Sequence, residues 1–280
     1  MIILNKIFRE LEKIYRLPFI SNIKEIFFIV CIAFFIFSFY NNFSEINLIQ
    51  YRIISTKFIL VIITFNILSL FMNGLAWKEL IKWTGNNIKG NQLVYLFVST
   101  NILKYVPGGI WHFIERFNYL KRFIGYKQSL VSILLEPILM ISSALFFIPF
   151  GYNSLILYVL LLAPSLLFNS NLIVKLIKIL ENIKIKTLKS LRIKQIETNE
   201  IKEILIRNHF PYKAWIYESL FVVFKFLSFW LCLVIFELDN QMDFLNCLSI
   251  FSLSWTIGLL VPSAPGGVGV FESIFLFLSN

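Results

Sequence analysis

Long apolar runs separated by polar, mostly basic connections set the pattern of the chain. Six of these runs approach the ~20 residues that a helix needs to cross ~30 Å of hydrocarbon. They cover residues 23–40, 57–77, 129–150, 153–170, 214–237 and 243–262. The pattern predicts an all-α polytopic membrane protein with about six full transmembrane helices.

The N-terminal segment has a different periodicity. Apolar and basic side chains in residues 2–17 fall on opposite faces of a helix. This arrangement is typical of an amphipathic helix on the cytoplasmic membrane surface, and a solvated first turn of the first span is the alternative. We therefore divide the chain into an interfacial N-terminal helix, 1–22, and a single transmembrane domain, 23–280.

Basic residues are concentrated in particular connections. Ten of the 26 Lys and Arg residues lie in the loop 171–213, where they alternate with apolar residues at near-helical spacing. Such a helix suits an anionic membrane surface. By the positive-inside rule, the cytoplasmic parts are the N-terminus, 78–91, 104–127 and 171–213. We therefore expect a multi-pass protein of the inner (cytoplasmic) membrane with a cytoplasmic N-terminus, in which segment 92–103 leaves the cytoplasm and returns to it.

The stretch LVYLFVSTNILKYV, residues 93–106, fits that requirement because it has the length of a re-entrant segment. A Pro-Gly-Gly turn follows, at which the chain can reverse, since Gly accepts positive φ and Pro cannot continue a helix. Non-helical backbone at membrane depth is tolerated where it is buried in protein or lines a wet cavity. The turn therefore indicates a cavity wall. The alternative is a short tilted span that ends at Pro107 and inverts the topology after it.

A similar segment returns near the C-terminus, which gives the chain a weak internal repeat. YVPGGIWHFIE at 105–115 and SAPGGVGVFE at 263–272 each contain PGG, then a β-branched residue, an aromatic residue and a Glu. Corresponding broken segments in two halves of a transporter point to its midplane binding site. We therefore expect two re-entrant or broken segments at the PGG motifs in addition to the spans.

The helix that starts after each PGG exposes free backbone N–H groups at its positive end, which suits a phosphate. His112 and Arg116 lie one turn apart and both could meet an anionic head group there. The alternatives are an interfacial, hydrogen-bonded His112 and an Arg116 that only sets topology. The candidate lipid-path and head-group residues are Pro107, Gly108, Gly109, Trp111, His112, Glu115, Arg116, Pro265, Gly266, Gly267, Gly269 and Glu272.

Three charged residues fall inside predicted spans. They are Glu136, which precedes Pro137, and the pair Glu218 and Lys225, which share a helical face two turns apart. An ionisable residue inside a membrane is costly and faces the bundle interior by default. These side chains either line a translocation path or a proton-coupled step, or they form structural ion pairs and interhelical hydrogen bonds. Among the acids, Glu272 after the second PGG ranks highest.

Composition agrees with a membrane protein and excludes several kinds of site. The chain is 58% hydrophobic and 15% charged with mean hydropathy +0.77, far from the soluble average of about a quarter charged. The net charge of +10 fits cytoplasmic loops, so no nucleic-acid partner is expected.

No P-loop spacing occurs, and His112 and His209 have no nearby Cys/His cluster. We expect no cofactor and no metal, and the three cysteines are small core hydrophobes.

Taken together, YVPGGIWHFIER and PSAPGGVGVFE on a scaffold of apolar spans resemble the transmembrane flippase-like region of the lysylphosphatidylglycerol synthase family. The similarity runs from about residue 20 to the end, and the second motif is the more specific. The resemblance implies a helical bundle with re-entrant elements that moves, or helps to move, lipids between leaflets. The chain lacks the aminoacyl-transferase domain of the fused members, so transfer of an amino acid from tRNA is not expected. It also ends soon after the second motif, where family members usually continue, so a partner chain could supply further helices.

Three functions remain open from the sequence. The first is translocation of an anionic phospholipid or lipid-linked precursor, downhill, proton-coupled or with a partner membrane subunit. The second is a non-transporting scaffold for bacterial envelope lipid or polysaccharide enzymes. The third is a polyprenyl-phosphate-dependent glycosyltransferase, which ranks low because the outer loop 41–57 offers only Glu45 as an acid. We therefore expect a non-enzymatic lipid transporter.

Overall fold

The computed structural model describes residues 56–88, 90–105, 111–151, 155–168, 209–238, 242–260 and 269–279. Within these ranges every regular element is a helix, as predicted. The α-helices are α3 (Thr56–Trp83), α4 (Gln92–Thr100), α5 (Trp111–Ile124), α6 (Tyr126–Phe147), α7 (Ala163–Leu167), α9 (Tyr212–Ile235), α10 (Phe244–Leu260) and α11 (Val270–Ser279). Short 3₁₀ helices are η1 (Asn101–Tyr105), η2 (Ile148–Gly151) and η3 (Leu155–Leu162). The N-terminal helix, the first span, both PGG turns and nearly all of the basic loop lie outside the described residues.

Three of the described helices are long and apolar enough to cross a membrane. They are Lys57–Trp83, Gln128–Gly151 and Tyr212–Ile235. α10 coincides with the predicted run 243–262 but has only 17 residues. By length and composition these helices agree with a membrane protein, whereas the total of six spans remains a prediction.

The predicted run 153–170 is not one long α-helix in the structure. It contains the eight-residue η3, followed by the five-residue α7, in whose first turn Pro164 lies. Proline has no N–H to donate and its ring clashes with the carbonyl four residues earlier, so an α-helix cannot run through this position undisturbed. The described part of the run therefore changes from a 3₁₀ to an α-helix at Ala163, next to Pro164.

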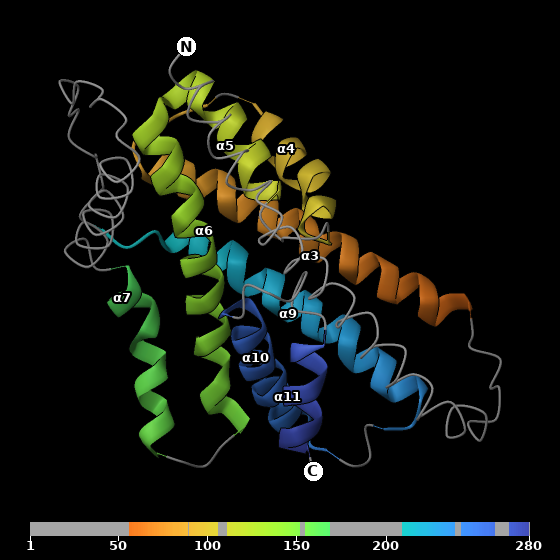
Figure 1. The fold of residues 1–280 in the computed structure, drawn as a ribbon. Coiled ribbons are helices and arrows are strands. Elements are labelled where there is room, and N and C mark those ends of the chain that lie inside the picture. The colour runs from red at the N-terminus through yellow and green to blue at the C-terminus, as the bar shows by residue number, and fades with distance from the viewer. Residues whose placement is uncertain are drawn as a thin grey trace, which may run out of the picture.

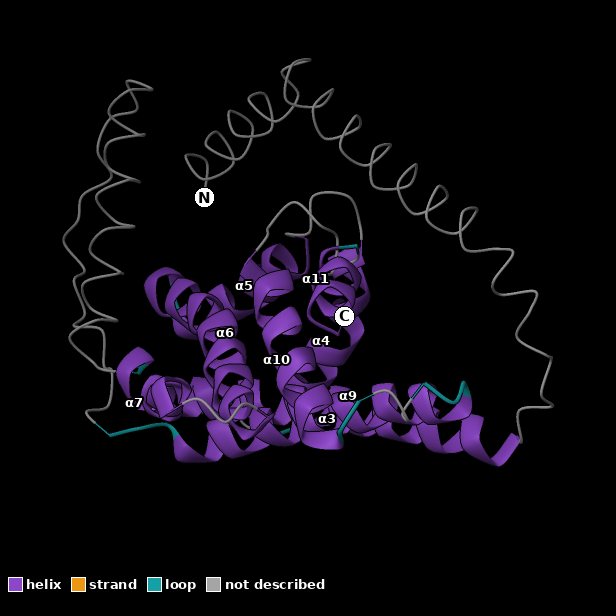
Figure 2. Cartoon of the chain, turned by 90° about the horizontal axis from the view of Figure 1, so that it is seen from below, coloured by secondary structure: helices purple, strands orange, loops and turns teal. Residues whose placement is uncertain are grey.

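The two longest helices, α3 and α9, lie side by side in one layer, and α6, α10 and the α4–α5 pair lie on one side of it (Figures 1 and 2). They are antiparallel: the rings of Phe65 and Phe224 stack 5.9 Å apart near one end. At the other end, Trp83 Nε1 donates to the carbonyl of His209 at 2.6 Å. α3 and α9, which are far apart in sequence, thus form the layer on which the other described helices pack.

Three apolar clusters join the other helices to this layer. One links α3, α6 and α9 through Leu80, Leu135, Leu139 and Ala214. A second links α3, α4, α5 and α6 through Trp77, Phe97, Leu120 and Ile133. A third, rich in aromatic residues, packs α9, α10 and α11 through Phe226, Phe251 and Phe275. The large apolar side chains exposed on α3, such as Phe58, Ile63, Ile67 and Phe71, give that helix a surface suited to lipid.

Helices α4 and α5 form an antiparallel hairpin, in which they lie next to each other (Figure 1). Tyr119 Oη donates to Gln92 Oε1 at 3.0 Å, and Arg116 reaches the last turn of α4. With nine residues and a rise of about 1.5 Å per residue, α4 is roughly 14 Å long, about half of a hydrocarbon core. η1 follows α4 directly. Whether this hairpin is re-entrant in a membrane remains a prediction.

Candidate functional site

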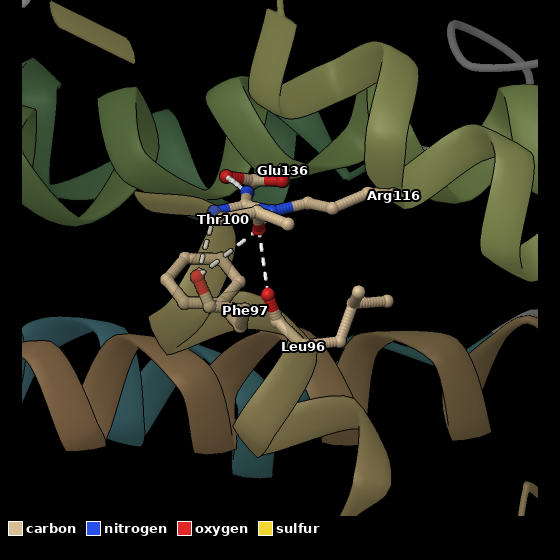
Figure 3. A network of polar contacts seen from close by, with 5 residues as sticks. All are labelled: Leu96, Phe97, Thr100, Arg116 and Glu136. Carbon is tan, nitrogen blue, oxygen red and sulfur yellow. Dashed lines mark hydrogen bonds and ion pairs between the residues drawn. The ribbon is translucent and has the colours of Figure 1, made fainter. Parts of the chain in front are cut away.

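A buried ion pair between Arg116 and Glu136 joins α5 to α6 (Figure 3), next to Trp77 and Phe97 of the second apolar cluster. Arg116 Nη1 lies 2.5 Å from Glu136 Oε1, and the side chain of Arg116 is fully buried. Its Nε donates to Thr100 Oγ1 at 3.0 Å and its Nη2 donates to the carbonyl of Phe97 at 3.2 Å. One guanidinium therefore ties together three helices, α4, α5 and α6.

The end of α4 explains why that carbonyl is available. At the C-cap, the N–H of Asn101 bonds to Val98 O, which is the shorter 3₁₀ pattern, and not to Phe97 O. The carbonyl of Phe97 is left for Arg116, whose positive charge also suits the negative end of the helix. Thr100 Oγ1 donates to Leu96 O at 2.6 Å, which turns its lone pairs toward Arg116.

Aromatic rings close the guanidinium off on its faces. The Cζ atom of Arg116 lies 3.7 Å from the ring centroid of Phe97 and 5.5 Å from that of Trp77. Such cation–π contacts strengthen when the cation is desolvated. Glu136 keeps its second oxygen, Oε2, buried and without a hydrogen-bond partner among the described residues.

A second carboxyl group lies close to this pair. Glu218 on α9 is 1% exposed, and among the described residues its Oε1 has no hydrogen-bond partner. Its charge and that of Glu136 repel each other. Glu218 does not pair with Lys225, although both residues lie on one face of α9.

Lys225 instead turns to α3, where its Nζ lies 2.8 Å from Asn66 Oδ1. Asn66 Nδ2 in turn donates to Ser228 Oγ at 2.5 Å. The sequence reasoning did not select Asn66. A detectable signal was present, because Asn66, Ser69 and Asn73 are polar residues at helical spacing inside an apolar run.

These polar side chains lie at the wall of a cavity of about 290 Å³ between α3, α9, α10 and α11. Its polar lining comes from Asn66, Lys225, Ser228 and Glu272. Its apolar lining includes Phe229, Phe251, Trp255, Leu259 and Phe271. Two residues that the sequence selected for different reasons, Lys225 and Glu272, therefore line one cavity.

Glu272 also caps the N-terminal end of α11. Its Oε2 accepts a hydrogen bond from the N–H of Gly269 at 2.6 Å, and Gly269 has a φ of 86°. A Glu at the third helical position that bonds back to the residue before the helix is half of a capping box. Glycine suits position 269 because, without a Cβ, it adopts a positive φ at no steric cost.

Two basic groups near Arg116, Lys104 and His112, have lowered pKa values. Burial, together with the nearby charges of Lys225 and Arg116, lowers the pKa of Lys104 to about 8. Burial, followed by the charges of Arg116 and Lys104, lowers the pKa of His112 to about 3. His112 is therefore neutral at physiological pH and brings no positive charge to a head group, whereas Lys104 is mostly charged.

The remaining selected residues are less informative. Trp111 and Glu115 occupy exposed positions of α5. The glycines and prolines of the two turns, Pro107, Gly108, Gly109, Pro265, Gly266 and Gly267, lie outside the described residues. Their part in a lipid path stays a prediction.

The described ranges contain no group of three or more His, Cys, Asp and Glu side chains placed to hold a metal ion. Comparison of the chain with protein-family models, with curated proteins and with solved structures found no match.

Proposed function

We propose that the protein translocates, or assists the translocation of, an anionic phospholipid or lipid-linked precursor across the cytoplasmic membrane. The observation that carries this proposal is the cavity beside Lys225. Its volume of about 290 Å³ lies at the lower end of the ~300–1,000 Å³ typical of ligand pockets, a size suited to a polar head group. Apolar surface on α3 next to it suits acyl chains.

The cavity has one basic and one acidic side chain in its lining, Lys225 and Glu272. The carboxylate of Glu272 already accepts a hydrogen bond from the N–H of Gly269, so Lys225 is the group that favours an anion. Lys225 contacts a neutral amide oxygen, and no described carboxylate lies within ion-pair distance of it. The positive charge of Lys104 acts on Lys225 as well. A cation in a low-dielectric site is stabilised by a counter-charge, which a phosphate group supplies.

The membrane arrangement that goes with this proposal has about six spans and two re-entrant segments at the PGG turns. It keeps the N-terminus in the cytoplasm, and it is the one that the resemblance to the flippase-like region implies. In this arrangement the second PGG turn directly precedes α11, whose first turn contributes Phe271 and Glu272 to the cavity. The turn and the cavity would then belong to one path.

The test is movement of fluorescent phosphatidylglycerol and of a zwitterionic lipid in proteoliposomes. Lys225→Met is expected to slow phosphatidylglycerol movement about tenfold or more, the factor that corresponds to one lost charged hydrogen bond of ~1.5–3 kcal/mol. Lys213→Met, which removes an exposed charge from the same helix, is the matched control and should leave the rate unchanged. No movement by folded wild-type protein would favour the scaffold function instead. Equal rates for wild type and Lys225→Met would exclude the cavity as the path.

The pKa of Lys104 provides a second prediction. The ammonium group is charged below its pKa of about 8 and neutral above it, so attraction of an anionic head group should weaken as the pH rises through 8. Phosphatidylglycerol should therefore raise the melting temperature of the protein more at pH 7 than at pH 9. Lys104→Arg should keep the full shift at pH 9, because a guanidinium stays protonated. Equal loss of the shift in wild type and Lys104→Arg would show that Lys104 is not responsible.

A further inference from the structure

The carboxyl group of Glu218 has no function in the proposed head-group site. It lies in the buried interior, where the free-energy cost of a charge is high. The residue is 1% exposed, within the membrane-length helix α9. Among the described residues it makes neither an ion pair nor a hydrogen bond. An isolated carboxylate in such surroundings costs several kcal/mol, so its neutral form is favoured.

No neighbouring cation offsets that cost. Helices α3, α6 and α10 pack against α9, and α11 touches it through Phe229 and Phe271. The sequence of α10 has no charged residue. The charged residues on these helices and on α9 itself are Lys57, Lys78, Glu79, Lys82, Lys127, Glu136, Lys213, Lys225 and Glu272. Among the described side chains of this set, Glu136 is the one whose charge acts on Glu218, and it repels a second negative charge.

The local charge balance agrees with a neutral Glu218. Arg116 and Glu136 form a pair whose charges cancel. The pair therefore offers no net positive charge to an ionised Glu218, whose charge would need a partner of its own.

Hydrogen bonding points the same way. Glu136 Oε2 and Asn73 Oδ1 are buried acceptors without a donor among the described residues. The antiparallel contacts of α3 with α9, from Phe65–Phe224 to Trp83–His209, place Asn73 at the level of Glu218. The O–H group of a protonated Glu218 is the donor that this set of acceptors lacks.

We propose that Glu218 and Glu136 form a buried proton-binding site beside Arg116, in which the two carboxyl groups hold one proton, carried mainly by Glu218. The ligand of this site is H⁺. Proton binding does not depend on lipid movement. Its use to couple transport to a proton gradient would rest on the proposed function.

Infrared spectra of the purified protein in lipid nanodiscs test the site directly, because a protonated carboxyl group has a carbonyl band separate from the bands of a carboxylate. Wild-type protein at pH 7 should show this band, and it should disappear on titration to alkaline pH. Glu218→Gln, which has nearly the same shape as the protonated side chain, should lack the band and stay folded. Glu79→Gln is the matched control, since Glu79 pairs with Lys82 and lies outside the proposed site, and it should keep the band.

The pH dependence of the melting temperature tests the assignment of the infrared band independently. The melting temperature of wild-type protein should fall more between pH 7 and pH 10 than that of Glu218→Gln, because ionising Glu218 introduces a buried charge that the variant cannot acquire. No band in wild type, a band that persists in Glu218→Gln, or failure of Glu218→Gln to fold would each overturn the proposal. Lipid scrambling that fails while the band behaves as expected would refute the proposed function and leave the proton site intact.

Discussion

Replacing Arg116 with methionine is expected to lower the free energy of unfolding by about 3–5 kcal/mol, the range observed when one partner of a buried ion pair is removed. The side chain of Arg116 is fully buried, and its loss leaves Glu136 as an unpaired buried charge. It also removes the charged donor of the carbonyl of Phe97, which keeps the 3.3 Å contact from Thr100 Oγ1. Chemical or thermal unfolding in detergent micelles measures the change.

The double variant Arg116→Met/Glu136→Met distinguishes the ion pair from packing. Because two methionines restore an uncharged interior, the double variant should be more stable than Arg116→Met alone, by at least ~1 kcal/mol. If the two single substitutions instead cost little and their effects add, the pair contributes no coupling energy. The network would then matter only for the geometry of the α4–α5 hairpin.

Gly151→Ala is the second substitution with a large expected effect, a destabilisation of about 1–3 kcal/mol or more from overpacking. A Cβ at this position would lie 2.5 Å from Leu245 O and 2.7 Å from Asn246 Cα, and would also clash with Ser249 Oγ. Two of these atoms belong to the backbone of α10, which cannot move aside by a rotamer change. The N–H of Gly151 also donates to Ser249 Oγ at 2.6 Å, a bond that displacement of the chain would break.

Gly74→Ala is its matched control on α3. The nearest atom to a Cβ there is Val94 Cγ1 at 3.1 Å, the end of a side chain that can shift. Alanine also gains up to ~1 kcal/mol of helix propensity over glycine, so we expect a change near zero. A Gly151→Ala protein as stable as wild type would mean that η2 and α10 are packed less closely than the structure has them.

The sequence located the long helices well because their signal is local. The runs at 57–77, 129–150, 214–237 and 243–262 lie within or overlap α3, α6 with η2, α9 and α10, since apolar length alone predicts a membrane helix. Within the run at 153–170 the described helix changes from 3₁₀ to α next to Pro164, a detail that hydropathy does not register because it ignores the missing N–H of proline.

The site was harder to predict because it depends on contacts between distant segments. Arg116 and Glu136 were both selected, the first as a phosphate contact and the second as an intramembrane charge. Their pairing follows from how α5 packs on α6, which periodicity does not determine. The sequence left open whether Glu218 and Lys225 line a path or form ion pairs and interhelical hydrogen bonds. In the structure Lys225 bonds to Asn66 across 159 residues of sequence. An uncharged amide such as Asn66 gives a weak signal in a search for charged residues.

The pairing of α3 with α9 has a consequence for synthesis of the chain on the ribosome. Residues 84–211 separate the two helices, and at ~5–20 residues per second α9 emerges roughly 6–25 seconds after α3. During that interval the polar face of α3, with Asn66, Ser69 and Asn73, has not met its permanent neighbour. Until α9 is inserted, the polar face of α3 therefore stays unpacked at the insertion machinery or contacts another protein. Cellular quality control can recognise defective chains during this interval.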